Sequence, residues 1–292
     1  MSTTDGRSSP DWDVDFYSRP VLEAGGRKRW ELLVCSAANG GDDGFRWARN
    51  CPADSVNSIW LREALAEALQ EAATRGLGTP RRLRCWRGSM RAMVQRAAEG
   101  LGLELVASRR CYALIDWLQQ REQEVYPTQE GYLSGPLAPP PMPVLPPARP
   151  LPEAARGDRW SWAHLTVEAM ADAAAWEIGF AGLVPTPASA SAEATVPGIR
   201  LFSSSRALAM AGWLAGLEPV RLEVRDRQLV LEAGLDDRWL LATLPANDAE
   251  AAASALADAR QQAGGLQFLA VQNDENATGF EGFWMLRDLP DG

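Results

Sequence analysis

The chain has a single histidine, a single lysine and no long apolar run, and each absence excludes a class of protein. A membrane-spanning helix needs about 20 consecutive apolar residues, and none of the apolar stretches approaches that length. The polar start lacks the apolar core of a signal peptide, so we expect a cytoplasmic protein without membrane insertion. The lone His164 argues against a histidine-based metal site and against catalysis that needs two histidines.

The cysteines show no C-x-x-C pair and no metal-ligand spacing. Each lies in or beside an apolar stretch, which predicts reduced thiols in the core; they are Cys35, Cys51, Cys85 and Cys111. Glycine-rich phosphate loops of the G-x-x-x-x-G-K and G-x-G-x-x-G types are absent too. We therefore expect neither a metal nor a cofactor.

What the chain does have is an ordinary globular composition and one strongly biased segment. Its 292 residues, 46% of them apolar and 23% charged, are enough for two domains. Nine prolines fall within residues 134–152, which predicts an extended polyproline linker. The expected organisation is a disordered lead at 1–11, an N-terminal domain at 12–133, a proline-rich linker at 134–157 and a C-terminal domain at 158–288.

The apolar pattern predicts α/β domains with mixed sheets on both sides of the linker. In the N-terminal half we expect three antiparallel strands, a helix capped by Asp54 or Ser55, and then strand, helix, strand and helix. This is the element order of ribonuclease-H-like folds. The expected strands lie at 13–17, 30–35, 45–49, 82–86 and 103–107 in this half, and at 161–167, 199–202, 220–225, 228–233, 238–244, 266–271 and 282–286 in the other.

Positive charge is concentrated in one window of an acidic chain. The formal net charge is -9, yet residues 81–112 hold eight arginines against two glutamates. Arginine with interleaved aromatic residues is typical of a surface for phosphates and stacked bases. The predicted RNA contacts are Arg81, Arg82, Arg84, Arg87 and Arg91 to phosphate, Trp86 and Tyr112 to bases, and Arg109 and Arg110 at a helix start. The alternative is that these arginines pair with the nearby glutamate-rich helix or are only solvated.

Both halves contain a strand, then Ser-x-Arg, then a helix with Trp-Leu seven residues after the arginine. The first copy has Ser108 and Arg110, and the second has Ser204 and Arg206. A serine N-cap and an arginine in the first turn favour an anion at the helix N-terminus. Arg206 is therefore a further predicted RNA contact. The alternative is an ordinary N-cap followed by a core-facing Trp-Leu pair.

Catalysis would need clustered carboxylates or a nucleophile with its base. A ribonuclease-H-like site holds two metals on four carboxylates, and Asp13 or Asp15 on the first strand would supply one of them. Glu63 and Asp116 would supply two more. Arg87 stands at the end of the fourth strand, where the fourth acid is needed, and it would repel the metals. We therefore expect no enzyme, with a residual metal-dependent nuclease as an alternative.

A set of longer segments, spread over residues 12–287, carries a family resemblance. In the first half they are D-F-Y-S-R-P (15–20), W-E-L-L-V-C (30–35), C-P-A-D-S-V-N-S-I-W-L (51–61), S-R-R-C-Y-A-L (108–114) and V-Y-P (125–127). In the second half they include P-G-I-R-L-F-S-S-S-R-A-L (197–208), A-G-W-L-A-G-L-E-P (211–219), F-L-A-V-Q (268–272) and G-F-W-M-L (282–286). These segments resemble the TAB/ATAB-type RNA-binding proteins of cyanobacteria and chloroplasts.

The resemblance implies a translation activator that binds the leader of an mRNA. The expected partner is a single-stranded, A/U-rich RNA. The expected outcome is synthesis of photosystem I reaction-centre subunits, and of photosystem II subunits as an extension. The expected location is the cytoplasm of a cyanobacterium. A second hypothesis is a scaffold in photosystem assembly. It would hold translation or assembly factors through the proline segment and the C-terminal half, which has 20 acidic and 11 basic residues.

Overall fold

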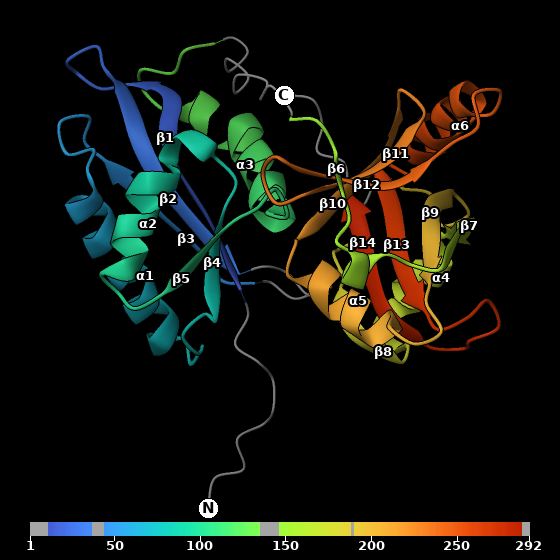
Figure 1. Ribbon diagram of the computed structural model, residues 1–292. Coiled ribbons are helices and arrows are strands. Elements are labelled where there is room, and N and C mark those ends of the chain that lie inside the picture. The colour runs from blue at the N-terminus through green and yellow to red at the C-terminus, as the bar shows by residue number, and fades with distance from the viewer. Residues whose placement is uncertain (1–10, 37–43, 135–145, 188–189, 288–292) are drawn as a thin grey trace, which may run out of the picture. The chain divides into compact units, whose positions relative to one another are not determined.

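The structure is a computed structural model that describes residues 11–36, 44–134, 146–187 and 190–287 (Figure 1). It separates into two compact units, and the boundary between them falls at Pro140–Pro141. Residues 1–10 of the expected lead and 135–145 of the expected linker lie outside the described residues, as do residues 37–43, 188–189 and 288–292. The two mixed α/β units confirm the fold class that the apolar pattern predicts.

The N-terminal unit is built on a five-stranded sheet. Its strands are β1 (Trp12–Leu22), β2 (Lys28–Ser36), β3 (Arg46–Cys51), β4 (Arg82–Cys85) and β5 (Glu104–Ala107). The strand order is β3-β2-β1-β4-β5. β1, β2 and β3 pair antiparallel, and β1, β4 and β5 pair parallel. The sequence of elements is therefore the ribonuclease-H-like order expected above.

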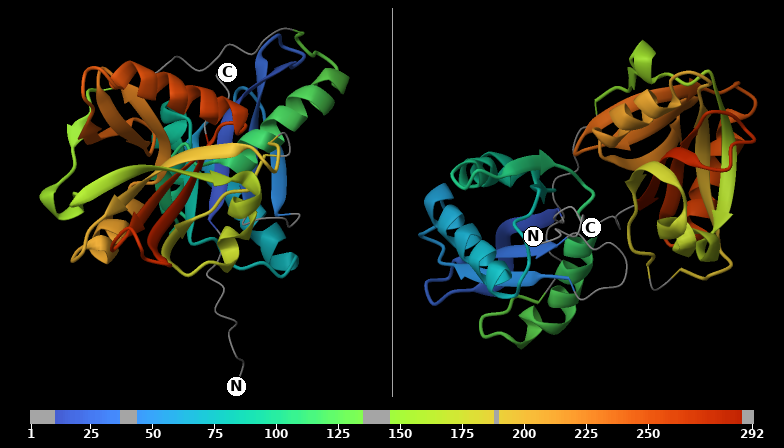
Figure 2. Two further views of the ribbon diagram at one scale, coloured as in Figure 1. Left: turned by 90° about the vertical axis from the view of Figure 1, so that its right-hand side faces the viewer. Right: turned by 90° about the horizontal axis from the view of Figure 1, so that it is seen from below.

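Three helices cover this sheet: α1 (Ser58–Thr74), α2 (Arg91–Glu99) and α3 (Tyr112–Glu124). α1 and α2 lie on one face and α3 on the other (Figures 1 and 2). α1 begins three residues beyond the expected cap at Ser55, because the Oδ1 of Asn57 accepts the N–H groups of Ile59 and Trp60. That corrects the predicted cap.

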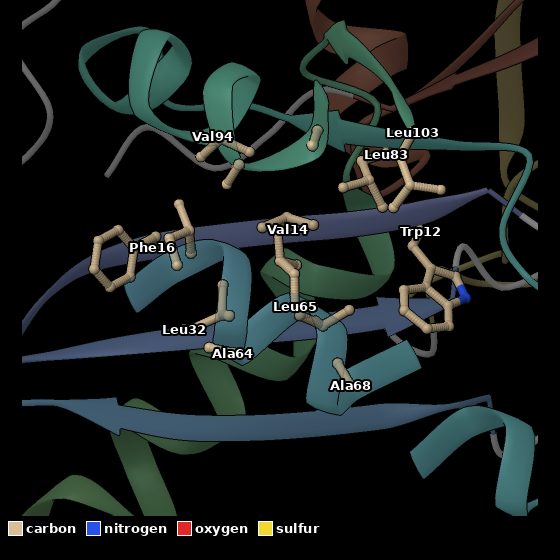
Figure 3. Close-up of a cluster of buried hydrophobic side chains, with 14 of the residues drawn as sticks. Trp12, Val14, Phe16, Leu32, Ala64, Leu65, Ala68, Leu83, Val94 and Leu103 are labelled. Carbon is tan, nitrogen blue, oxygen red and sulfur yellow. The ribbon is translucent and has the colours of Figure 1, made fainter. Parts of the chain in front are cut away.

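Strand β1 separates an apolar face from a charged one. Trp12, Val14 and Phe16 point into the cluster under α1 and α2, which Figure 3 shows with Leu65 of α1 and Val94 of α2. Because alternate residues of a strand face opposite sides, the intervening aspartates turn to the α3 side. The sheet therefore has one purely apolar face, and its other face carries ionised groups.

The end of the predicted linker belongs to the C-terminal unit. β6 (Arg149–Pro150) pairs with β12 (Asp237–Thr243), and Leu151 and Ala155 are buried. A guanidinium nitrogen of Arg238 donates to the backbone carbonyl of Pro146. Residues 146–157 thus pack as part of a folded unit that begins before the expected boundary at 158.

The C-terminal unit contains a mixed five-stranded sheet in the order β7-β9-β13-β14-β8. Its strands are β7 (Arg159–Thr166), β8 (Ile178–Gly182), β9 (Thr195–Phe202), β13 (Leu266–Gln272) and β14 (Phe280–Arg287). All of β13 is buried, as a near-continuous apolar run predicts for a central strand. β8 was not expected from the sequence, because its two glycines weaken the strand pattern.

A smaller sheet contains β10 (Pro219–Arg225), β11 (Gln228–Ala233), β12 and β6 in the order β10-β11-β12-β6. The helices of this unit are α4 (Val167–Ala171), α5 (Ala207–Ala215) and α6 (Ala249–Gln262). One apolar cluster joins α5, α6 and both sheets, and a second joins α4 to the opposite face of β13. The Gln267 side chain also binds both backbone polar groups of Leu222, which ties β13 to β10.

All four cysteines are buried free thiols, as predicted. Burial raises the pKa of Cys51 to about 11 and that of Cys85 to about 12, and it raises the pKa values of Cys35 and Cys111 well above the ordinary value of a thiol. Within the part of the chain that the structure covers, no helix has both the length and the apolar character to cross a membrane.

Candidate nucleic-acid interface

The arginine-rich strand β4 lies beside an acidic stripe on β1. The two strands are parallel, and Asp13 is the register partner of Arg84. Alternation along each strand places Asp11 and Asp15 on the same face of the sheet as Asp13, and Arg82 on the same face as Arg84. The fold therefore lays a row of carboxylates beside a row of guanidinium groups, although Asp11 and Arg82 are 71 residues apart in sequence.

Three arginines of the window converge on Asp11, just before β1. The Nε of Arg81 lies 3.1 Å from Oδ1, the Nε of Arg82 lies 3.0 Å from Oδ2, and an Nη of Arg84 lies 2.6 Å from Oδ2. Burial raises the pKa of Asp11, but the hydrogen bond from Arg81 and the charges of Arg84 and Arg82 outweigh it and hold the pKa below its ordinary value. Asp11 was expected in a disordered lead; it is instead buried and fixes the start of β4.

Arg87, just past the end of β4, pairs with Asp15. Its Nε is 2.5 Å from one carboxylate oxygen, and an Nη of Arg19 is 2.8 Å from the other. Asp15 is fully buried, which raises its pKa, but the charges of Arg19 and Arg87 lower the pKa below its ordinary value. Arg87 is only 10% exposed, so its guanidinium group is committed to this carboxylate.

A further set of ion pairs extends inward from Asp15. The Nε of Arg19 lies 3.0 Å from Glu31 on β2, and the hydroxyl of Tyr126 donates to the same carboxylate at 2.6 Å. Arg121 of α3 pairs with Glu31 as well. Because an unpaired buried charge is costly, these mutual contacts are what allows the network to lie between the sheet and α3.

The two predicted stacking residues differ in exposure. Trp86 is partly exposed, and the guanidinium carbon of Arg87 lies 4.2 Å from its ring centroid. Tyr112 is only 2% exposed, on the buried side of α3, with the Arg110 guanidinium 5.7 Å from its ring. A ring buried in this way is not presented to a base. The structure therefore corrects the stacking role of Tyr112, because its apolar surface is used in the core.

The carboxyl ends of β4 and β5 lie at the same edge of the sheet because the strands are parallel. We call residues 86–91 and 108–110, which follow these two strands, the carboxyl edge. It brings together five of the predicted contacts: Trp86, Arg87, Arg91, Arg109 and Arg110. α2 and α3 begin there, with their N-termini directed toward the same edge. Arg81 and Arg82 lie at the opposite end of β4, and Arg84 lies between the two ends.

The arginines of the carboxyl edge differ in how exposed their side chains are. Arg91 is exposed, Arg109 is partly exposed, and Arg110 is 8% exposed. The N–H group of Arg110 donates to the Oγ of Ser108 at 3.0 Å, and α3 begins only after Cys111. Ser108 therefore orders the turn into α3, and it is not the N-cap that the sequence predicts.

The second Ser-x-Arg segment binds a carboxylate of its own chain. The Ser204 N–H donates to Asp158 at 3.0 Å, and Arg206 pairs with the same carboxylate at 3.4 Å. The pKa of Asp158 is lowered, chiefly by the hydrogen bond from the Ser204 N–H and to a smaller extent by Arg206. Arg206 also donates to the backbone carbonyls of Glu153 and Arg156, and it is itself the N-cap of α5. The anion expected at this segment is thus an internal side chain.

Comparison with known proteins decides the family. Sequence models of the RNA-binding protein Tab2/Atab2 match residues 11–121 with their N-terminal domain and residues 139–287 with their C-terminal domain. The chain belongs to the Tab2/Atab2 family of RNA-binding proteins. A chloroplastic TAB2 homolog from Zea mays is 36% identical over 98% of this chain and 73% of its own length. One from Arabidopsis thaliana is 31% identical over 98% of this chain and 77% of its own length. No solved structure was found to match.

The carboxylates of the nuclease alternative are not brought together in this Tab2/Atab2 chain. Asp15 is buried on the α3 face of the sheet, whereas Glu63 is exposed on α1, which covers the opposite face. Asp116 is exposed on α3. Over the described ranges, no group of three or more histidine, cysteine, aspartate or glutamate side chains is arranged to hold a metal ion.

Sequence reasoning missed three participants of the site: Asp11, Arg19 and Tyr17. Tyr17 lies on β1, and the Arg87 guanidinium carbon is 4.1 Å from its ring centroid. The alternating D-W-D-V-D at residues 11–15 was a readable signal, because a strand with acids on one face needs compensating charge on a neighbour. The glutamates of α1, the partners expected from sequence, pair with Arg49 and Arg75 instead.

Proposed function

We propose that this protein activates translation by binding the single-stranded leader of an mRNA that encodes photosystem I reaction-centre subunits. Photosystem II transcripts are the next candidates, and the cytoplasm of a cyanobacterium is the proposed setting. Family membership over both units supports this function. Leaders rich in A and U have little secondary structure, which suits a surface that takes unpaired RNA.

The proposed RNA surface is the carboxyl edge. The single observation that carries it is the convergence of Arg91, Arg109 and Trp86 at the ends of two parallel strands, where two helix N-termini also point. Guanidinium groups and helix N-termini both attract phosphate. Arg110 and Arg87 are largely buried, so we assign them to the interior side of this surface and not to direct contact with RNA. Arg81, with a 59% exposed side chain, adds positive charge at the other end of β4.

Binding of a 20-nucleotide A/U-rich RNA, measured at several salt concentrations, tests this surface. Each phosphate contact contributes about 0.7 to the slope of log K against log salt for a single strand. The change Arg91→Glu with Arg109→Glu is expected to weaken binding and to reduce the slope by roughly 1.4.

The matched control is Arg75→Glu with Arg159→Glu, which changes the net charge equally at two arginines that are not part of the carboxyl edge. Both arginines are more than half exposed and sit in surface ion pairs. If the control pair weakens binding as much as the test pair, attraction is spread over the protein and the carboxyl edge is not the site.

The role in translation is tested in cells. Removal of the protein is expected to lower the pulse-labelled synthesis of photosystem I reaction-centre subunits while the amount of their mRNA stays constant. Crosslinking followed by sequencing of the bound RNA identifies the transcript. Crosslinks confined to coding regions, or to unrelated transcripts, would contradict leader binding.

We further propose that the protein has no nuclease activity. The support is that Asp15, the acid a first metal would need, already holds two arginines. Incubation of labelled RNA with magnesium or manganese is expected to leave it intact. Cleavage that Asp15→Asn abolishes would overturn the proposal.

The scaffold alternative has one observation in its favour. Among the described residues of the acidic C-terminal unit, Trp162, Phe180 and Leu208 are large apolar side chains that are 36% to 57% exposed. Such side chains suit a protein partner better than RNA phosphates. Co-purification of translation or assembly factors that persists after ribonuclease treatment, and is lost with Leu208→Ser, would favour this function.

A further inference from the structure

A row of aromatic rings crosses β1 and reaches the carboxyl edge. Trp30 on β2 lies 5.7 Å from Tyr17 on β1, measured between ring centroids. The Arg87 guanidinium carbon then lies 4.1 Å from the Tyr17 ring and 4.2 Å from the Trp86 ring. Four side chains from three different segments thus lie next to one another in the order Trp30, Tyr17, Arg87, Trp86, which we call the stacking row; the Trp30 and Tyr17 rings are tilted by 60°, and Arg87 lies over the Tyr17 and Trp86 rings.

A buried ion pair fixes the position of the stacking row. Arg87 is anchored by the fully buried Asp15, which Arg19 holds in turn. A planar guanidinium group packed on two aromatic faces restricts how either ring can turn. Rings that are already oriented lose little conformational entropy when a flat ligand binds.

The rings of the stacking row remain accessible at the surface. Trp30, Tyr17 and Trp86 are each partly exposed, in contrast to the neighbouring Phe16, which is fully buried. The partly exposed rings, rather than the buried indole N–H of Trp86, are therefore the surface on which a ligand can bind.

We infer that the stacking row is the site where unpaired RNA bases stack, with Tyr17 and Trp86 as the contacting rings and Arg87 as a positioning residue. This rests on the proposed RNA binding and names the residues that select single strands over duplex. Every base has a flat aromatic face, so the site accepts any base that is unstacked from its neighbours. Bases in a duplex are already stacked on both sides, and they are excluded.

The role given to Arg87 differs from the phosphate contact that the sequence predicts. A phosphate contact adds to the salt dependence of binding, whereas a residue that only orients rings does not. Arg87→Lys keeps the charge but loses the planar group. The inference expects weaker binding with an unchanged salt slope, while a phosphate contact expects binding close to that of the unaltered protein.

The test is binding of a 12-nucleotide single-stranded RNA and of the same sequence as a duplex, with intact full-length protein. Tyr17→Ala and Trp86→Ala are each expected to weaken single-strand binding about tenfold and to leave duplex binding unchanged. Tyr17→Phe and Trp86→Phe keep a ring and are expected to restore most of the affinity. Trp162→Ala, which removes an exposed ring of the C-terminal unit, is the matched control.

The outcomes separate the inference from the function on which it rests. If the unaltered protein binds neither RNA, the proposed function fails. If it binds RNA and both alanine variants bind equally well, the stacking row is wrong and the function stands. A loss that the phenylalanine variants do not restore, with unfolding seen by circular dichroism, shows that the rings only stabilise the fold and also overturns the inference.

Discussion

The two five-stranded sheets of this protein differ in what their central strands bury. In the C-terminal unit, β13 is buried on both faces against apolar clusters, and its two buried side-chain amides, Gln267 and Gln272, are neutral and bond to backbone groups. In the N-terminal unit, β1 is equally central, but its α3 face carries Asp15, Arg19 and their partners. Residues 1–133 contain 18 acidic and 18 basic residues, so the opposite charges of this half balance in number.

The difference shows where the fold keeps specific polar contacts. A buried ion pair is rarely more stabilising than a well-packed apolar pair, but it fixes one arrangement of its members. In the N-terminal unit that arrangement positions Arg87 and the rings beside it. The apolar sheet of the C-terminal unit has no comparable link between its interior and an arginine-rich edge within the described residues.

The largest expected effect comes from breaking the buried network. Arg19→Ala leaves Asp15 and Glu31 buried without one of their partners, and the free energy of unfolding of the N-terminal unit should fall by about 3–5 kcal/mol. All four cysteines lie in this unit, so the rate of thiol labelling in mild denaturant measures its stability alone. The control Arg75→Ala removes an exposed pair with Glu71 in the same unit and should cost less than about 1 kcal/mol.

The second largest effect is expected at low pH, which should destabilise the N-terminal unit before the C-terminal unit. The pKa values of Asp11 and Asp15 lie below their ordinary value in the folded state. Such groups stabilise the fold above their unfolded pKa of about 3.9, and this stability is lost as the pH falls through the lower folded values. Below about pH 4, hydrogen exchange should therefore accelerate in β1 earlier than in β13.

The variant Asp11→Asn sharpens the acid experiment. It removes one of the titrating carboxylates, so the stability of the N-terminal unit should be lower at pH 7 but should depend less on pH below about 4. Equal acid sensitivity in the variant and the unaltered protein would show that Asp11 does not contribute.

The smallest expected effect concerns the helix starts of the two units. Asn57 accepts two backbone N–H groups at the start of α1, so Asn57→Ala should lower stability by about 1 kcal/mol. Asp248 occupies the N-cap of α6 without a side-chain capping bond, and Asp248→Ala should have little effect. Thermal unfolding of both variants measures the difference; equal losses would mean that the Asn57 bonds do not stabilise α1.

Local pattern was sufficient for most of the fold. Alternation and turn residues placed each strand of the N-terminal sheet, because side-chain period and caps depend on neighbours in sequence. The exceptions are informative. β6 and β8 are short and contain proline or glycine, so their pairing depends on strands from distant segments. Asn57 replaced the expected caps, since several polar residues in a row compete for one helix start.

For the candidate site, the sequence by itself determined that arginines gather in one window and that Trp86 lies among them. Only the tertiary structure decided which of these residues face outward. Arg84 turns to Asp11 just before β1, Arg87 turns to Asp15 on β1, and Tyr112 turns into the core. Strand register and helix packing bring these residues together although they are far apart in sequence. Charge is a local property of the chain, whereas the partner of each charge is set by the fold.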